Sequence, residues 1–204
     1  MQHESKTRIL DAAMQVIRAK GYSATTIDDV CLAAGLTKGS FFHHFKSKEE
    51  LALAAAGHFA SWADRLFAQA PYRVLGDPLD RVLGYVDFRK AILNGPLPER
   101  TCLLGTMVQE TFESHPAIRE ACHTHISAHA AEVAKDITAA KLLYAPNATW
   151  SAEGLALYTQ AVIQGAFILA KAKNGPEIAT ECLGHLRRYL EMLFNQPNLK
   201  EEKL

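Results

Sequence analysis

The chain has 204 residues, 49% of them hydrophobic, with 22 basic and 22 acidic side chains. This length and composition predict a globular protein with room for one small domain and one larger domain. The formal net charge of zero argues against a general polyanion binder, so any affinity for nucleic acid has to come from a local surface.

The first predicted helix spans about residues 5–20, and its apolar side chains have the three- and four-residue spacing of one buried face. Gly21 follows it, in the position where many helices end in a left-handed residue. We expect this helix to support the elements that come after it. Its predicted inward side chains are Ile9, Ala12, Ala13, Val16 and Ile17.

Residues 26–36 predict a short second helix that ends in a tight turn. Thr26 can cap this helix, and Gly35 stands where the chain needs a left-handed conformation that only glycine adopts cheaply. Leu36 then fills the corner before the next helix. The predicted inward positions of the second helix are Ile27, Val30, Cys31 and Ala34.

A third helix of about two turns begins after a Thr37 cap, and Ser47 starts a fourth helix with Glu50 as its capping-box partner. The stretch from Thr37 to Lys48 has three lysines and two histidines but no acid, so positive charge is concentrated here. Two short helices joined by a tight turn are the layout of a DNA-reading helix-turn-helix. The helix starts at Thr26, Thr37 and Ser47 would offer N–H groups to phosphates. The side chains left to face base edges are Lys38, Gly39, Ser40, Phe42 and His43.

Helical periodicity and turn signals predict six helices from Ser47 onward. No alternating strand pattern and no internal repeat occurs, so the predicted fold class is all-α with about nine helices. The expected ranges are about 47–69, 78–93, 102–113, 116–143, 151–173 and 177–194.

The penultimate predicted helix has no charged side chain over residues 154–170 and therefore no obvious water-facing side. Its small residues Ala161, Gly165 and Ala166 would let another helix approach closely. Two helices from each of two subunits would form a four-helix interface, and burial inside one monomer is the alternative. The last helix offers an apolar stripe to this interface: Ile178, Cys182, Leu186, Leu190, Leu193 and Phe194.

Residues 154–170 are fewer than the roughly 20 apolar residues of a membrane span and include Gln160 and Gln164, so no transmembrane helix is predicted. The first residues are charged and polar rather than a secretory signal. The four cysteines are far apart and form no C-x-x-C pair, which favours a reducing cytoplasm. They are Cys31, Cys102, Cys122 and Cys182.

Residues 35–51, GLTKGSFFHHFKSKEEL, resemble the N-terminal signature of TetR-family transcriptional regulators. The resemblance extends back through residues 7–13, TRILDAA, and Gly21-Tyr22, and covers about the first quarter of the chain. It implies a helix-turn-helix DNA-binding domain at residues 1–48, followed by a helical effector-binding and dimerisation domain at residues 49–204.

The resemblance also implies roles for single residues. Phosphate contacts are expected from Thr26, His43, Lys48 and the position of Phe42. Family members commonly have tyrosine at that position, and Phe42 lacks the hydroxyl that would bond a phosphate, so it can offer only apolar contact. His44 also stands where tyrosine is frequent, and we expect it to pack against the first helix. Base contacts are expected from Thr37, Lys38, Gly39 and Ser40.

The C-terminal domain has candidates for an effector pocket, because ligand pockets are usually lined by apolar and aromatic side chains. Plain core packing is the alternative for each of them. Gln109 and His125 are candidates to orient a ligand. The predicted pocket residues are Tyr85, Phe88, Met107, Phe112 and Ile126.

Two sets of side chains suggest other chemistry. Cys102 is the redox candidate, because a thiol at a helix start has a lowered pKa; an inert cysteine is the alternative. Cys122, His125 and His129 share one helix face and are weak candidates for a transition-metal site, and histidines hydrogen-bonded to neighbours are the alternative.

We therefore predict a cytoplasmic, dimeric, ligand-responsive transcriptional regulator that acts as a repressor. Its expected partners are a pseudopalindromic double-stranded DNA operator, an unknown small-molecule effector and a second copy of the chain, with no membrane and no cofactor. No catalytic machinery is expected. The alternatives are an all-α metal-binding protein or enzyme that uses Cys122, His125 and His129, and a dimeric ligand carrier without DNA affinity.

Overall fold

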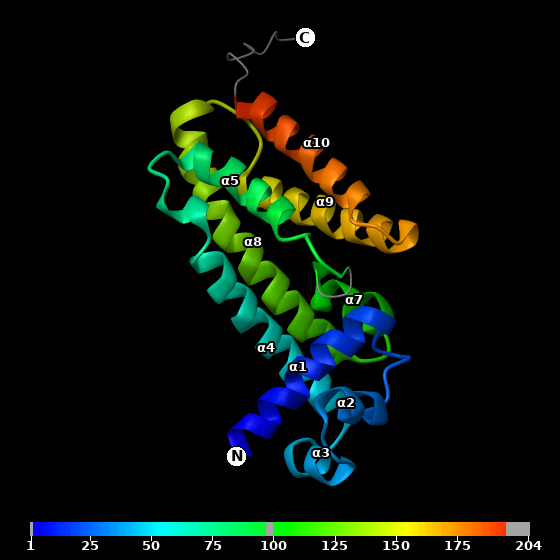
Figure 1. Ribbon diagram of the computed structural model, residues 1–204. Helices are drawn as coiled ribbons and strands as arrows, with labels where there is room; N and C mark the ends of the chain where they lie inside the picture. The colour runs from blue at the N-terminus through cyan, green and yellow to red at the C-terminus, as the bar shows by residue number, and fades with distance from the viewer. Residues whose placement is uncertain (1, 97–99, 195–204) are drawn as a thin grey trace. The chain divides into compact units, whose positions relative to one another are not determined.

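The computed structural model describes residues 2–96 and 100–194, and this part of the chain is α-helical with no strand (Figure 1). The predicted all-α fold is thus confirmed, and nine α-helices and one short 3-10 helix lie within the described residues. The helices are α1 (Gln2–Lys20), α2 (Ile27–Ala34), α3 (Lys38–His44), α4 (Lys48–Ala68), η1 (Pro71–Val74), α5 (Pro78–Ala91), α7 (Leu103–Thr111), α8 (Pro116–Tyr144), α9 (Ala152–Lys173) and α10 (Glu177–Phe194).

The chain divides into two compact units. Unit 1 comprises Met1–Phe67 and Pro98–Ile126, and unit 2 comprises Ala68–Leu97 and Ser127–Leu204. Helix α8 therefore contributes residues to both units. This division follows packing, whereas the predicted domains at residues 1–48 and 49–204 follow expected function and stay a prediction.

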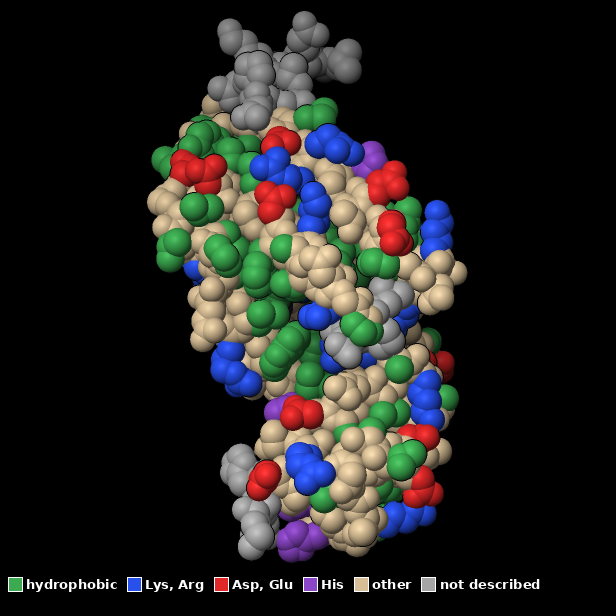
Figure 2. All heavy atoms as spheres, in the orientation of Figure 1, with side chains coloured by type: hydrophobic (Ala, Val, Ile, Leu, Met, Phe, Trp, Pro, Cys, Tyr) green, Lys and Arg blue, Asp and Glu red, His purple; other side chains and the backbone are tan. Residues whose placement is uncertain are grey.

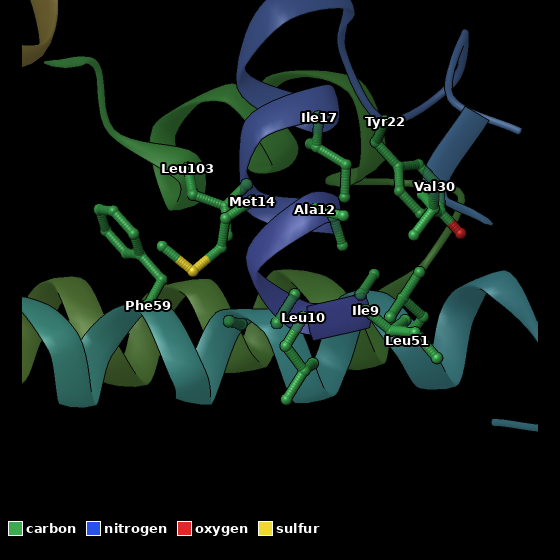
Figure 3. Close-up of a cluster of buried hydrophobic side chains, with 14 of the residues drawn as sticks. Ile9, Leu10, Ala12, Met14, Ile17, Tyr22, Val30, Leu51, Phe59 and Leu103 are labelled. Atoms are coloured by element: carbon green, nitrogen blue, oxygen red, sulfur yellow. The ribbon is translucent and has the colours of Figure 1, made fainter. Parts of the chain in front are cut away.

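Unit 1 is built around an apolar core that α1 shares with α2, α4 and α7 (Figure 3). The spacing of apolar residues along α1 places one face of that helix inside. Burying each large aliphatic side chain contributes about 1.5–3 kcal/mol. Figure 3 shows Leu10, Met14 and Ile17 of α1 with side chains from the other helices: Val30, Leu51, Phe59 and Leu103.

The beginnings and ends of α2 and α3 are set by local hydrogen bonds. The Thr26 side chain accepts the N–H of Asp29, and Gly35 ends α2 with a φ of 61°. The Thr37 side chain accepts the N–H of Ser40 at the start of α3. These caps and the glycine turn are as predicted.

The capping box expected at α4 is only half formed. Ser47 Oγ accepts the N–H of Glu50 at 3.1 Å, as expected. The Glu50 carboxylate, however, accepts the N–H of Lys46 at 2.7 Å, one residue before the cap. The Glu50 side chain therefore satisfies the N–H before the cap rather than that of Ser47 itself.

In unit 2, α10 packs against both α9 and α5, and η1 packs against α5. This arrangement differs from the predicted role of the α10 stripe, because its apolar residues largely face helices of their own chain. Contact with α5 supplies the partner that the sequence did not reveal. The buried side chains of α10 are Ala179, Leu183, Leu186, Leu190 and Phe194.

Helix α9 is covered on one side only. Its buried face includes Leu155, Ile163 and Phe167, whereas its opposite face is exposed. By length and composition α9 could cross a membrane, but buried core helices pass the same test, and 44% of its most apolar window is buried inside the protein. The large apolar side chains exposed on α9 are Leu157, Tyr158, Ile168 and Leu169.

Candidate nucleic-acid interface

Helix α3 presents one face outward because two aromatic side chains anchor its other face. Phe41 and Phe45 are buried, four residues apart, with ring centroids 5.7 Å from each other. Lys38, Gly39 and His43 are exposed, and Phe42 is 55% exposed. Such a rigid, outward helix of about two turns suits entry into a DNA major groove.

The turn before α3 is held by α1. Gly35 donates its N–H to Leu32 at 3.1 Å, and Leu36 donates to Cys31 at 2.9 Å. Arg8 of α1 donates to the carbonyl of Ala34 at 2.6 Å, which satisfies a free acceptor at the end of α2. Long-range and local bonds together fix the angle between α2 and α3.

Thr26, a predicted phosphate contact, is already part of a capping box. Its hydroxyl donates to Asp29 at 2.5 Å, and its N–H donates to the same carboxylate at 2.7 Å. Lys20 forms an ion pair with Asp29 at 2.5 Å. Lys20, followed by the two Thr26 donors, holds the pKa of Asp29 below its ordinary value. The carboxylate therefore stays ionised and keeps the start of α2 in place.

Lys38, a predicted base contact, lies beside an acid that the sequence analysis did not single out. Its ammonium is 2.9 Å from the Asp28 carboxylate, and the two side chains are 60% and 67% exposed. This pairing raises the pKa of Lys38. Because both groups face water, the ammonium can exchange this partner for another acceptor.

Lys48, a predicted phosphate contact, makes its bonds inside the protein. Its ammonium donates to the carbonyls of Tyr22 at 3.1 Å and Thr25 at 3.0 Å, with Ser23 at 3.4 Å. It also lies 4.3 Å from the centre of the Tyr22 ring. A phosphate contact by Lys48 would therefore compete with internal bonds.

His44 packs as expected, with Nε2 2.7 Å from Ser5 Oγ on α1. Burial, followed by the nearby His43 and Lys6 charges, lowers the pKa of His44.

Figure 2 shows histidine (purple) and Lys or Arg (blue) side chains on the surface in the region of α3. Lys38 and Lys46 are exposed, with Lys38 paired to Asp28, whereas Lys48 bonds inside the protein. The positive charge predicted for this stretch is thus only partly on the exposed face.

The predicted effector residues fall in both units. Tyr85 and Phe88 belong to unit 2, whereas Met107, Phe112 and Ile126 belong to unit 1. Met107 is fully buried in the unit 1 core. A surface hollow of about 530 Å³ in unit 1 includes two of the five predicted residues. It is lined by Val108, Phe112, Arg119, Glu120, His123 and Ile126.

Unit 2 contains a polar chain that sequence reasoning missed. The Tyr85 hydroxyl lies 3.0 Å from His129 Nε2 and accepts a hydrogen bond from the Gln160 amide at 2.9 Å. Burial, followed by the Arg89 and Arg73 charges, lowers the pKa of His129 to about 3. Gln160 in a charge-free helix was the available signal, because a buried amide needs a partner. Gln109, which the sequence analysis suggested as a ligand-orienting group, donates to the carbonyl of Gly105 in its own helix.

The cysteine and metal hypotheses fare differently. Cys102 does open α7, and its sulfur accepts the N–H of Gly105 at 3.4 Å. Cys122 is fully buried, and burial raises the pKa of its thiol to about 12, which disfavours the thiolate that binds metals. His129 is bonded to Tyr85 instead. Within residues 2–96 and 100–194, no three His, Cys, Asp or Glu side chains are grouped to hold a metal ion, so the metal-site alternative has no support.

Hydrophobic side chains are exposed in several patches on the unit 2 surface, among charged ones (Figure 2). The exposed face of α9 continues onto α10, where Tyr158 and Tyr189 have ring centroids 5.3 Å apart. Tyr189 and Met192 of α10 are exposed. A stripe of this kind, on two adjacent helices, is typical of an association surface.

Two family models match the chain. The model of bacterial regulatory proteins of the tetR family matches residues 9–55, and the C-terminal domain model of LmrA/YxaF-like transcriptional regulators matches residues 78–178. The first match includes α2 and α3, and the second extends from α5 to the start of α10.

Curated relatives and solved structures agree with these matches. The chain is 30% identical to the transcriptional regulator AcuR of Cereibacter sphaeroides over 54% of this chain and 49% of that protein. It is 38% identical to the HTH-type transcriptional repressor KstR2 of Mycobacterium tuberculosis over 37% of this chain and 38% of that protein. The chain thus spans half or less of the length of these two relatives. A crystal structure of a TetR transcriptional regulator from Chloroflexus aurantiacus superposes with a TM-score of 0.81 and 25% identity, over 93% of this chain and 96% of that one.

Proposed function

Because the chain belongs to the TetR family of bacterial regulatory proteins, we propose that it is a DNA-binding transcriptional regulator that represses its target genes. The observation that carries this proposal is α3, which Phe41 and Phe45 anchor from inside. Its outer face has a cation, a glycine and exposed aromatic side chains.

In the proposed complex, α3 lies in the major groove. Thr37, Lys38, Gly39 and Ser40 approach base edges at its N-terminal end, where the helix axis can point into the groove. The α2 start at Thr26 and the exposed side chains of Phe42 and His43 approach the sugar-phosphate backbone. Phe42 contributes apolar contact there, because it has no hydroxyl to donate.

We propose that the protein acts as a homodimer through the exposed face of α9 and its continuation on α10. Leu157, Tyr158, Ile168 and Leu169 would be covered by the same face of a second copy, as a two-fold interface requires. Two copies of α3 then reach successive major grooves, about 34–36 Å apart, on a pseudopalindromic site. Sedimentation at working concentration tests this directly, and lone subunits would overturn the dimer.

We further propose that a small-molecule effector releases the DNA and that the protein works in the cytoplasm. An effector that binds better to a conformation with a different spacing of the two α3 helices shifts the population away from the DNA-bound form. The candidate pocket residues are Tyr85 and Phe88 in unit 2 and Met107, Phe112 and Ile126 in unit 1. Cys102 is the candidate for a response to oxidants or electrophiles.

Selection of bound duplexes from a random DNA pool, followed by affinity measurement at several salt concentrations, tests the DNA-binding function. We expect a two-fold related sequence and affinity that falls as salt rises. Recovery of no preferred duplex would favour the ligand-carrier alternative.

Gly39→Ala probes the proposed approach of α3 to the bases. A Cβ at Gly39 would be 3.6 Å from Thr37 Oγ1, an ordinary contact, and alanine favours a helix by about 1 kcal/mol over glycine. We therefore expect unchanged or higher stability but at least about tenfold weaker binding to the selected duplex, equivalent to about 1.4 kcal/mol. Gly184→Ala on α10, whose Cβ would be 3.9 Å from Arg188 Nη1, is the matched control and should bind normally.

A further inference from the structure

The turn between α1 and α2, residues 21–25, is held by a carboxylate from a distant part of the chain. Ser23 donates its N–H to Glu110 Oε2 at 2.7 Å, and Glu110 lies on α7. The same carboxylate packs against Gly21, where an added Cβ would overlap Glu110 Oε1. Gly21 also has a φ of 87°, a conformation that favours glycine, and a side chain there would displace the Glu110 carboxylate.

The opposite side of this turn is held by Lys48 at the start of α4. Lys48 binds the carbonyls of Tyr22 and Thr25, and the Thr25 hydroxyl donates to the carbonyl of Gly21 at 2.6 Å. Glu110 therefore binds an N–H of the turn while Lys48 binds its carbonyls. The turn is fixed from two helices at once.

The position of this turn determines where α2 begins. Thr26, its next residue, is the N-cap of α2, and α2 in turn packs against α3. Because α2 has only eight residues and α3 has seven, neither can absorb a displacement of the turn along its length. A shift of α7 that moved Glu110 would thus be passed to the helices of the candidate DNA interface.

We propose that Glu110 is a positioning residue for DNA binding, which ties α7 to the 21–25 turn and so sets the place of α2 and α3. This inference rests on the DNA-binding function proposed above. It predicts that removal of Glu110 weakens DNA binding, although its negative charge alone would predict the reverse. Removal of an exposed acid from a DNA-binding unit should strengthen DNA affinity by electrostatics alone, whereas loss of the tie should weaken it.

Three variants at Glu110 separate the hydrogen bond to Ser23 from the charge of the carboxylate. Glu110→Gln loses the charge but keeps an oxygen that can accept the Ser23 N–H. Glu110→Asp keeps the charge but is one methylene too short. Glu110→Ala loses both. Glu113→Ala, which removes an exposed acid just beyond α7, is the matched control for charge.

The experiment measures fluorescence anisotropy of the full-length proteins on the duplex selected by the wild type and on an unrelated duplex, with melting temperatures for each protein. We expect Glu110→Asp and Glu110→Ala to bind the selected duplex about tenfold or more weakly. Glu110→Gln should stay within about threefold of the wild type, and Glu113→Ala should bind equally or more tightly. Should Glu110→Ala fail to fold, the comparison of Glu110→Asp with Glu110→Gln still tests the positioning role.

Equal binding by the wild type and Glu110→Asp would overturn the inference, as would a loss in Glu110→Gln as large as in Glu110→Asp. Failure of the wild type to select any duplex would overturn the proposed function itself. The two failures are therefore distinguishable in one set of measurements.

Discussion

The two units of this protein satisfy their buried polar side chains in different ways. In unit 1, Arg18 donates to the carbonyl of Met14 at 3.0 Å, and Thr111 donates to that of Met107 at 2.8 Å. Each of these bonds stays within one helix and reaches back four residues. These two buried side chains are satisfied within their own helices, so apolar packing arranges the core of unit 1, while bonds between elements, such as Ser23 to Glu110, hold its periphery.

In unit 2, Thr159 also donates within its own helix, to Leu155 at 2.8 Å, but other buried or half-buried side chains bond between helices. Tyr85 of α5 bonds to His129 of α8 and Gln160 of α9. Arg81 of α5 donates to Asp136 of α8 at 2.7 Å. These bonds depend on direction and protonation, whereas apolar contacts do not.

The difference suggests a division of work between the units. An apolar core keeps the short helices of the candidate DNA interface in one arrangement. In unit 2, removal of one partner of an inter-helix polar bond leaves a buried group unsatisfied, so we expect the packing of these helices to depend on protonation. Three measurements test this difference between the units.

The largest effect is expected from Phe41→Ala in unit 1. Phe41 is fully buried, and its removal should lower the free energy of unfolding by about 3–5 kcal/mol, measured by chemical denaturation. Its neighbour Phe42 is exposed, so Phe42→Ala should change stability by no more than about 0.5 kcal/mol. Similar losses in the two variants would mean that apolar burial does not hold α3.

A smaller, pH-dependent effect is expected from His129 in unit 2. Its pKa is about 3 in the folded protein and about 6.5 in the unfolded chain, so the unfolded chain binds the extra proton between these values. The stabilisation is complete above pH 6.5 and is lost as the pH falls toward 3. The free energy of unfolding should fall by about 2 kcal/mol between pH 7 and pH 5.

Denaturation of His129→Gln across this range measures that contribution, because the variant cannot titrate at this position. Its stability should depend less steeply on pH than that of the wild type. His185→Gln, at an exposed position, should retain the wild-type slope. If the stability of His129→Gln depended on pH as steeply as that of the wild type, His129 would bind its proton in the folded protein as readily as in the unfolded chain.

The smallest effect is expected from Lys48→Ala, which loses internal hydrogen bonds worth about 1 kcal/mol. As a residue that holds the 21–25 turn, it should weaken binding to every duplex several-fold without a change in salt dependence. Lys38→Ala should weaken binding to the selected duplex more than binding to an unrelated duplex. If the salt slope of Lys48→Ala fell by about one, a phosphate contact would be assigned to Lys48 instead.

The sequence was sufficient where structure depends on neighbours along the chain. Thr26, Gly35 and Thr37 act within three or four residues of themselves, so the helix ends at α2 and α3 were predictable. The apolar periodicity of α1 likewise predicted its buried face. Local hydrogen bonds and helical spacing can be read from residue order alone.

The tertiary structure decided which distant groups meet. Residue order gives no sign that Glu110 reaches Ser23, that Lys48 binds the carbonyls of Tyr22 and Thr25, or that α10 turns its apolar stripe toward α5. Helical periodicity identifies the face of a helix that is buried but not the helix that covers it. The choice of partner depends on how all the helices pack at once, and only the folded chain contains that information.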